Sequence, residues 1–587
     1  MTQFLAILRV WFSRPVGAAL LSAVFPGLGQ AAAGQKSRGA IIAIPGLSVV
    51  GALLLIVLFF RNSLFGSAVD PAFLTSLLIL DLVALVYHVW AVVDAFMVAR
   101  KPVADPRRRR SSRAPLSAAA VLGVGLILSS TVVVHAGVAS MDLDLQHTIG
   151  CISALTPCWA TNTLAPGETI PITSDDPNVS LVSDDPGTSP DTSLGTPAPG
   201  GTFDPSKLPN IATTDDSKNW AADGQLNVLL LGVDSGNGGS RNAGLRPDSM
   251  IVLHLDIASG RAAMIGIPRN TMCVPLPQAV AQHYGKAQNG CPAYTWPYML
   301  NWLANDAGWN HPTYYPFFQG KDAQGHDLAY ARAVTATEQG IETLTGLKID
   351  GYVMINLMGL VGLIDALGGI DINVPTQVYD KPCGKAGTAQ SKYRVCNLNP
   401  PHDGYGLPEA NGVVPQKMID DAANSNGMQT ITYKSKNGYD IGFVIKAGKQ
   451  HMDGDWALAY ARTRIYTTDF DRIKRQQLVL KSLRSTLDPC TILPRIPDLM
   501  NSLGDALLTN MPLADANRWA GMAQHILGGN VQTVNLDPKT LGLNTSQVYF
   551  TPALWAKAKN LVAHSLDSAT PASGGGSGGG SGGGLTC

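Results

Sequence analysis

The chain has 587 residues, which is too many for a single hydrophobic core, and 45% of them are hydrophobic while only 15% are charged. Lys and Arg together number 43, and so do Asp and Glu, so no overall positive charge draws the chain to nucleic acid. This composition predicts two or three units, part of them in lipid, and argues against a nucleic-acid partner.

Three apolar stretches near the N-terminus are long enough to be transmembrane helices: about 39–60, 73–98 and 115–139. The first 35 residues hold a shorter apolar run that Pro26 and Gly27 interrupt, which is typical of an interfacial or re-entrant segment. We therefore predict an all-α transmembrane region over residues 1–140.

The second of these stretches contains three ionisable side chains, Asp81, His88 and Asp94, at nearly helical spacing. Ionisable groups within a membrane helix are candidates for function. They can equally serve a structural role, facing a neighbouring helix that offers hydrogen-bond partners. The sequence favours the structural role and leaves the functional one open.

The most basic run of the chain, RKPVADPRRRRSSR at 100–113, lies between the second and third stretches. Basic loops stay in the cytoplasm, so we predict a multi-pass protein of the cell membrane with a cytoplasmic N-terminus. Everything after about residue 140 is then extracytoplasmic. A short basic run beside a membrane helix signals topology far more often than DNA binding.

All eight cysteines follow residue 150, which fits disulfides in an oxidising compartment. Zinc is the competing interpretation, and the closely spaced C-x-x-C pair that it usually requires is absent. Sequence does not fix the connectivity, and the simplest one joins neighbours: Cys151 with Cys158, Cys273 with Cys291, Cys383 with Cys396, and Cys490 with Cys587.

Composition divides the remainder of the chain. Residues 141–224 are rich in Pro, Ser, Thr and Asp and predict an extended stalk, and 566–587 form a Gly/Ser-rich tail. Between them, strand patterns such as SMIVLHLDI alternate with helical patterns such as ARAVTATEQGIETLTG over 225–565. This alternation predicts an α/β domain with three layers, α-β-α, around a central mixed sheet, with a polar insertion at about 378–440.

Polar residues gather where the predicted strands begin or end. Asp234 ends the first strand, Arg246 and Asp248 precede the second, and Arg269 follows the third. Arginine binds phosphate oxygens with a two-pronged fork, and paired carboxylates can hold Mg²⁺. No Walker loop is present, so this pattern indicates phosphate chemistry without a nucleotide. A later segment adds further charges: Arg462, Arg464, Asp469, Asp471, Arg472 and Arg475, with Gln476 beside them.

Six blocks in order resemble the signature blocks of the LytR-CpsA-Psr family: GVD, RPDSMIVLHLD, IGIPRNT, IDGYVMINLMGLVGLIDALGGIDINV, HMDGDWALAYARTR and DFDRIKRQQ. They cover roughly residues 225–540, and the ordered set is far more specific than any one block. The resemblance implies a bacterial cell-wall ligase. Such a Mg²⁺-dependent phosphotransferase moves a glycopolymer from a polyprenyl pyrophosphate carrier onto peptidoglycan or a related acceptor. It also implies an apolar tunnel for the polyprenyl tail, with residues 352–369 in its wall.

The resemblance also implies roles for single residues. Asp234 and Asp248 match the metal-associated carboxylates, and Asp248, Arg269 and Arg472 are the expected catalytic residues. The family has no undisputed catalytic base; in this chain Asp248 and Asp469 are the two candidates to activate the acceptor hydroxyl. The expected pyrophosphate-binding residues are Arg246, Arg269, Arg462, Arg464, Arg472, Arg475 and Gln476.

The chain departs from the family pattern at several positions. Pro247 stands where the family usually has Ser, Asn270 stands where it has Asp, and Asp471 stands where it has Gly. The KINAAY-type block expected between residues 271 and 320 is poorly recognisable. Asn270 and Asp471 are the best support for an alternative in which the protein binds polyprenyl pyrophosphate lipids, or regulates envelope assembly, without turnover. A transcriptional regulator, the third interpretation, conflicts with an extracytoplasmic domain.

Overall fold

The structure is a computed structural model, and it forms two compact units, one of helices up to Ile149 and one from Gly150 onward. It describes residues 15–59, 70–100, 118–154, 223–233, 244–321, 327–380, 428–435, 438–463, 468–486, 495, 499, 502–503, 507–511, 531–543, 548–567 and 569. The predicted stalk between 155 and 222 and the Gly/Ser-rich tail from 570 onward lie outside the described residues.

The N-terminal unit consists of helices: α2 (Pro15–Val24), α3 (Leu28–Ala32), α4 (Lys36–Phe59), α6 (Pro71–Ala99) and α7 (Ala118–Ile152). The last three occupy the predicted apolar stretches, and α7 extends further toward the C-terminus than the 115–139 expected. Within the part of the chain that the structure describes, two segments are long and apolar enough to cross a membrane, Pro71–Ala99 and Val121–Ile152. Asp70 caps α6 by accepting a 2.9 Å hydrogen bond from the Ala72 N–H, and Pro71 fits the first helical turn.

Pro26 and Gly27 form the turn between α2 and α3. Gly27 has a φ of 98°, a left-handed conformation that favours glycine. A side chain at this position would also collide with the carbonyl oxygen of Gly39 in α4 and lie 3.0 Å from the Ala43 nitrogen. The glycine therefore allows α3 and α4 to pack in close contact.

The second unit is built on a six-stranded mixed sheet with the strand order β12-β6-β1-β2-β3-β13. The β1–β6 and β3–β13 pairs are parallel and the other pairs are antiparallel. The strands are β1 (Gln225–Val233), β2 (Pro247–Asp256), β3 (Arg261–Ile267), β6 (Gly351–Asn356), β12 (Leu507–Thr509) and β13 (Gln532–Asn535).

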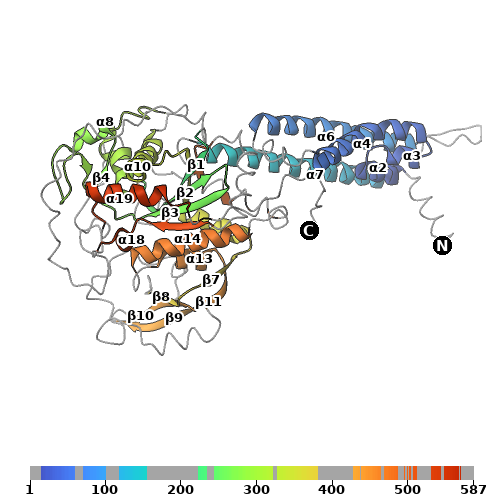
Figure 1. Ribbon diagram of the computed structural model, residues 1–587. Coiled ribbons are helices and arrows are strands. Elements are labelled where there is room, and N and C mark those ends of the chain that lie inside the picture. The colour runs from blue at the N-terminus through green and yellow to red at the C-terminus, as the bar shows by residue number, and fades with distance from the viewer. Residues whose placement is uncertain are drawn as a thin grey trace, which may run out of the picture. The chain divides into compact units, whose positions relative to one another are not determined.

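Helices cover both faces of this sheet, as Figure 1 shows. On one face, α10 (Ala329–Thr345) and α19 (Pro552–Ala563) share a hydrophobic core with alternate strand residues such as Leu229 and Val252. The other face carries α11 (Leu357–Ala366), α13 (Gly454–Arg462) and α14 (Asp469–Thr486), with a second apolar cluster beneath them. The predicted three-layer α-β-α architecture with a mixed sheet is confirmed.

Smaller elements complete the unit. The described parts of the predicted insertion are strands: β8 (Val378–Asp380), β9 (Met428–Ser435) and β10 (Gly438–Ile445) form a separate three-stranded sheet. The strand β7 (Ile370–Val374) pairs with β11 (Gly448–Met452) and not with the central sheet. Short elements between the larger ones are β4 (Val274–Pro275), α8 (Gln278–Ala281), η3 (Gln282–Tyr284), β5 (Thr295–Trp296), η4 (Leu300–Trp302), α9 (Leu303–Asn305), η5 (Asp306–Asn310), η6 (Pro312–Tyr314) and α18 (Pro538–Leu541).

Cys273 and Cys291 form a disulfide, which confirms one of the four predicted pairs. Cys151 is disulfide-bonded as well. Cys158, Cys383, Cys396, Cys490 and Cys587 lie outside the described residues.

The close packing of α14 on the sheet depends on Gly266 in β3. A Cβ at this position would lie 2.6 Å from Ile473 Cγ2 and 2.9 Å from Gln477 Nε2, both on α14. We expect Gly266→Ala to lower the free energy of unfolding by about 1–3 kcal/mol, because α14 must move outward. Thermal unfolding of the full-length protein in detergent measures the loss.

Gly285→Ala is the matched control for this substitution. Its Cβ would meet nothing nearer than 3.4 Å and its φ is −67°, so alanine fits there. Equal melting temperatures for Gly266→Ala and Gly285→Ala would contradict the packing argument.

Candidate functional site

Asp248 and Arg269 meet at one edge of the central sheet because of the strand register. Met250 of β2 lies opposite Ile267 of β3, so continuing the antiparallel pairing by two residues places Asp248 opposite Arg269. Arg269 Nη1 donates to Asp248 Oδ1 at 3.1 Å, and only 2% of the Arg269 side chain is exposed. A buried ion pair therefore joins the beginning of β2 to the loop that follows β3.

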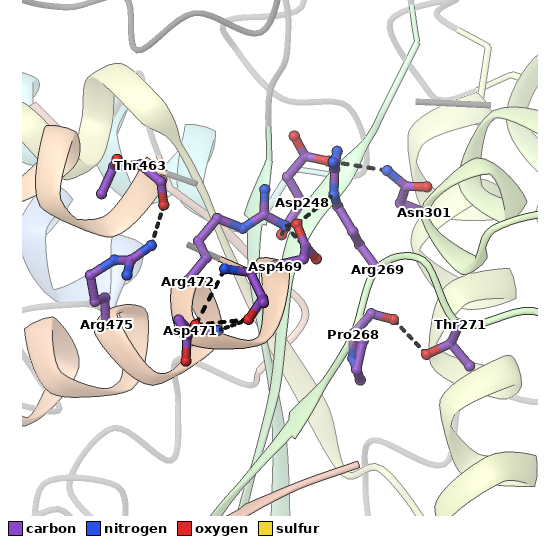
Figure 2. Close-up of polar contacts among 11 residues, drawn as sticks. Asp248, Pro268, Arg269, Thr271, Asn301, Thr463, Asp469, Asp471, Arg472 and Arg475 are labelled. Carbon is purple, nitrogen blue, oxygen red and sulfur yellow. Dashed lines mark hydrogen bonds and ion pairs between the residues drawn. The ribbon is translucent and has the colours of Figure 1, made fainter. Parts of the chain in front are cut away.

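The first turn of α14 reaches the same edge and adds Asp469 and Arg472 (Figure 2). Arg269 Nε lies 3.4 Å from Asp469 Oδ1, and Arg472 Nη2 lies 3.0 Å from the same oxygen. Arg472 Nη2 also donates to the main-chain carbonyl of Asp248 at 3.2 Å. Two buried guanidinium groups thus share one carboxylate, and the four side chains form one network.

A capping box explains how α14 begins at this point. The Thr468 hydroxyl accepts a 3.2 Å hydrogen bond from the Asp471 N–H, and the Asp471 carboxylate accepts one of 3.2 Å from the Thr468 N–H. Asp471 also pairs with Lys474 at 3.2 Å. The acid that replaces the family's glycine therefore caps a helix, and it does not by itself indicate a loss of activity.

Asn301 holds the pair from the other side. Its Nδ2 donates to Asp248 Oδ1 at 3.1 Å, and its main-chain N–H donates to the Arg269 carbonyl at 3.2 Å. The side chain is fully buried. Asn301 was not predicted as a site residue, because it lies in the segment where the expected block was poorly recognisable. The signal that was missed is the Asn301–Asn305 spacing of four residues, which places both amides on one helical face.

The same segment also positions Arg246. Asn305 Oδ1 accepts a 2.8 Å hydrogen bond from the Leu245 N–H, directly before Arg246 in the chain. The Arg246 guanidinium lies over the Trp302 ring, 4.8 Å from its centroid. Stacking on an aromatic face holds an arginine in place while it keeps its charge.

Charge at the site keeps Asp248 ionised. Burial alone would raise the pKa of Asp248, but the positive charges of Arg269, Arg246 and Arg472 hold that pKa well below its usual range. Among the described residues, the hydrogen bonds to the carboxylate reach Oδ1 only. Asp248 is therefore an anion at neutral pH, with its Oδ2 available to a ligand.

The remaining predicted residues lie farther from this network or outside the described part of the chain. Arg475 Nε donates to the Tyr460 carbonyl at 3.0 Å and its Nη2 donates to the Thr463 carbonyl, so it braces the end of α13 against α14. Arg462 is the last residue of α13, and the Gln476 Oε1 atom is buried without a hydrogen bond. Their contact with pyrophosphate stays a prediction. Asp234 and Arg464 lie outside the described residues.

The described residues contain no group of three His, Cys, Asp or Glu that could hold a metal ion. The predicted partner of Asp248, Asp234, lies outside them. Asp248 suits Mg²⁺ nonetheless, because Mg²⁺ often takes one or two protein carboxylates and completes its shell with water and phosphate oxygens.

Residues 204–289 and 329–560 match the LytR_cpsA_psr family, which is more than half of the chain. The chain belongs to the LytR_cpsA_psr family. The segment between the two matched parts, 290–328, contains Asn301, Trp302 and Asn305.

Curated relatives at low identity have names that describe transfer to the cell wall. The chain is 26% identical over 225 residues to the polyisoprenyl-teichoic acid–peptidoglycan teichoic acid transferase TagU of Enterococcus faecalis, covering 36% of this chain and 60% of that one. It is 21% identical over 328 residues to the transferase TagV of Bacillus subtilis, covering 55% and 60%. The chain thus spans about 60% of the length of these relatives.

Two solved structures are similar to the second unit. The crystal structure of Bacillus subtilis TagV matches with a TM-score of 0.33 and 18% identity, covering 58% of this chain and 97% of that one. Protein gbs0355 of Streptococcus agalactiae matches with a TM-score of 0.35 and 17% identity, covering 60% and 92%.

The depressed pKa of Asp248 predicts how stability depends on pH. At pH 7 the wild type is expected to be more stable than Asp248→Asn by about 3 kcal/mol, because the variant leaves buried guanidinium groups without their anion. A carboxylate with a lowered pKa stabilises the fold above its ordinary pKa, about 3.9, and this contribution is lost as the pH falls through the lowered pKa. The difference between the two proteins should therefore shrink below about pH 4.

Chemical denaturation of both full-length proteins at pH 7, 5 and 3 measures this difference. A gap in unfolding free energy that stays constant over this range would show that the charge of Asp248 contributes nothing.

Proposed function

We propose that this protein transfers a glycopolymer from a polyprenyl pyrophosphate carrier onto peptidoglycan or a related cell-wall acceptor. The observation that carries the proposal is the network of Asp248, Arg269, Asp469 and Arg472 at the strand ends. Together with Arg246, the network has three positive and two negative charges. A pyrophosphate group would neutralise the excess positive charge. The family membership and the names of the relatives support the same reaction.

The reaction requires one bond to form and one to break. The acceptor hydroxyl attacks the phosphorus that carries the glycopolymer, the bridging P–O bond breaks, and polyprenyl phosphate leaves with the bridging oxygen. The hydroxyl proton passes to a base or to water. Arg269 and Arg472 stabilise the charge that grows on the bridging and terminal oxygens, because buried guanidinium groups need no reorganisation.

Neither candidate base is favoured strongly. Asp248 is a weak base, since its pKa is held well below the usual range, and Asp469 is shared between two guanidinium groups. Positioning and charge neutralisation therefore provide most of the catalysis. We propose Mg²⁺ as the cofactor, held by Asp248 and Asp234, where it would supply further neutralisation of the phosphate oxygens.

One face of the central sheet is suited to the polyprenyl tail. The register places Leu230 of β1 beside Val353 of β6, on the face opposite the main hydrophobic core. Both are only partly buried although their strands are central, and so are Leu253 and Ile355. Partly exposed apolar side chains inside a layered fold provide a surface for an apolar ligand. Two of these side chains, Val353 and Ile355, belong to the segment 352–369 that is expected to form the tunnel wall.

The N-terminal helices are proposed to anchor the protein in the cell membrane, with the second unit outside and the N-terminus inside. Two helices of sufficient length and the basic run at 100–113 support this topology. An oxidising environment for the second unit accords with the Cys273–Cys291 disulfide.

The decisive experiment follows release of polyprenyl phosphate from a polyprenyl pyrophosphate substrate by the full-length protein with Mg²⁺. Arg472→Ala and Asp248→Ala are each expected to reduce the rate by about 100-fold or more, because each removes charge stabilisation at the pyrophosphate. Chelation of the metal should abolish release.

Lys474→Ala is the control, because it removes a positive charge from an exposed side chain of α14 that lies only two residues after Arg472 and pairs with Asp471 outside the network. It should leave the rate within a few-fold of wild type. Tight binding of intact lipid without release, with a competent acceptor present, would favour a non-catalytic lipid-binding or regulatory protein.

The tail surface can be tested separately from the chemistry. Val353→Trp should slow turnover of a long polyprenyl substrate while leaving a short-chain analogue nearly unaffected, because the larger ring occupies the surface that only a long tail reaches. The ratio of kcat/KM for the two substrates measures the effect. An equal loss for both substrates would remove this face from the proposed tail site.

A further inference from the structure

The N-terminal unit contains a chain of three polar contacts that joins three helices. Asp81 and His88 lie two turns apart on α6, and His135 lies on α7. Asp81 Oδ1 is 2.7 Å from His135 Nδ1, and His135 Nε2 is 3.3 Å from His88 Nδ1. His88 Nε2 is 3.0 Å from the main-chain carbonyl of Ser22 in α2. These helices pack side by side through Ala19, Val92 and Ile127 (Figure 1).

The three contacts require one more hydrogen than two neutral histidines and an ionised aspartate can supply. Each contact needs one hydrogen between its two atoms, so three are needed. A carbonyl only accepts, so His88 Nε2 must carry a hydrogen. Two neutral imidazoles provide two hydrogens, and an ionised Asp81 provides none. The third is an additional proton, carried either by the Asp81 carboxyl group or between the two rings.

Charge leads to the same conclusion. With the added proton, Asp81, His135 and His88 are neutral as a group; without it they carry one negative charge. Only 17% of the Asp81 side chain and 14% of the His135 side chain are exposed, and the surrounding faces of α6 and α7 are apolar. An uncompensated charge in such surroundings is costly.

No lysine or arginine among the described residues compensates Asp81. Arg38 of α4 pairs with Asp94 at 2.5 Å, and Gln30 of α3 donates to the same carboxylate at 3.1 Å. Tyr87 donates to the Ile42 carbonyl, and α2 has no ionisable side chain. The other ionisable side chains on these helices lie toward their ends: Lys36, Asp70, Arg100, Asp142, Asp144 and His147.

We propose that the N-terminal helices contain a proton-binding site, in which Asp81, His135 and His88 hold one exchangeable proton that links α6, α7 and α2. When the pH rises and the proton leaves, three contacts share two hydrogens, so one contact loses its hydrogen bond and the group becomes anionic. The lost contact weakens the link of α6 to α7 or, where it is the His88–Ser22 contact, the link of α6 to α2. The site gives this membrane unit a response to pH, and it does not depend on the proposed transferase activity.

The test uses the full-length protein in lipid nanodiscs, with EDTA present so that no metal ion replaces the proton between the rings. Hydrogen–deuterium exchange of α2, α6 and α7 is measured from pH 6 to pH 9 and corrected for the intrinsic exchange rate. In the wild type, protection where α6 contacts α7 or α2 is expected to fall by about tenfold across this range, the effect of losing one hydrogen bond to a charged group. Protection that does not change with pH would overturn the proposal.

Asp81→Asn is the informative variant. The amide can donate a hydrogen to His135 Nδ1, so all three contacts are filled without an added proton. Protection in this variant should no longer depend on pH. Asp94→Asn is the matched control: it removes the other carboxylate of α6, so it should lower protection equally at each pH and keep the wild-type pH dependence. An Asp81→Asn variant that retains the wild-type pH dependence would overturn the proposal.

A second readout needs no variant. In ¹⁵N-histidine-labelled wild type, a coupling across the hydrogen bond between two ring nitrogens should be present at pH 6. His88 and His135 form the one hydrogen bond between histidine rings that the described residues contain. The absence of this coupling at every pH would contradict a shared proton, even if Asp81→Asn fails to fold.

Discussion

The buried pairing of Asp248 with Arg269 is the interaction on which the arrangement of the second unit's site depends. It fixes the edge of the sheet where β2 begins and β3 has ended, and it brings the first turn of α14 there through Asp469 and Arg472. A buried ion pair is costly to form, and its partners must be well satisfied by hydrogen bonds. Asn301 satisfies part of this need by donating to the Asp248 carboxylate, and the main-chain carbonyl of Asp248 does so by accepting from Arg472.

Much of this arrangement could be predicted from local sequence. The apolar alternation in β1, β2 and β3 fixes which side chains enter the core, and the polar residues at the strand ends then meet at one edge. Asp248, Arg269 and Arg472 were predicted together for this reason. The α-β-α layering follows from the alternation of strand and helix patterns, since each element has to bury one apolar face.

Other features depend on contacts between distant parts of the chain, which periodicity does not encode. The strand pattern IDINV predicts β7 correctly, but its antiparallel pairing with β11, a strand remote in sequence and outside the central sheet, is not encoded in that pattern. The edge strands β12 and β13 have three and four residues, too few for a periodic signal. Asn301 was not predicted because its role depends on hydrogen bonds to Asp248 and Arg269, which are remote from it in sequence. Arg475 looks like a phosphate ligand in sequence, and only the fold shows that it donates to main-chain carbonyls.

The disulfide between Cys273 and Cys291 closes a loop that begins four residues after Arg269. The chain then returns to the same place, because the Leu300 N–H bonds to the Thr271 carbonyl and the Asn301 N–H bonds to that of Arg269. The covalent bond thus restrains the segment that carries both partners of Asp248. Disulfides persist in oxidising compartments, so this restraint on the arginine site is present only where thiols are oxidised. Under the proposed topology, its formation accompanies the passage of the second unit out of the cytoplasm.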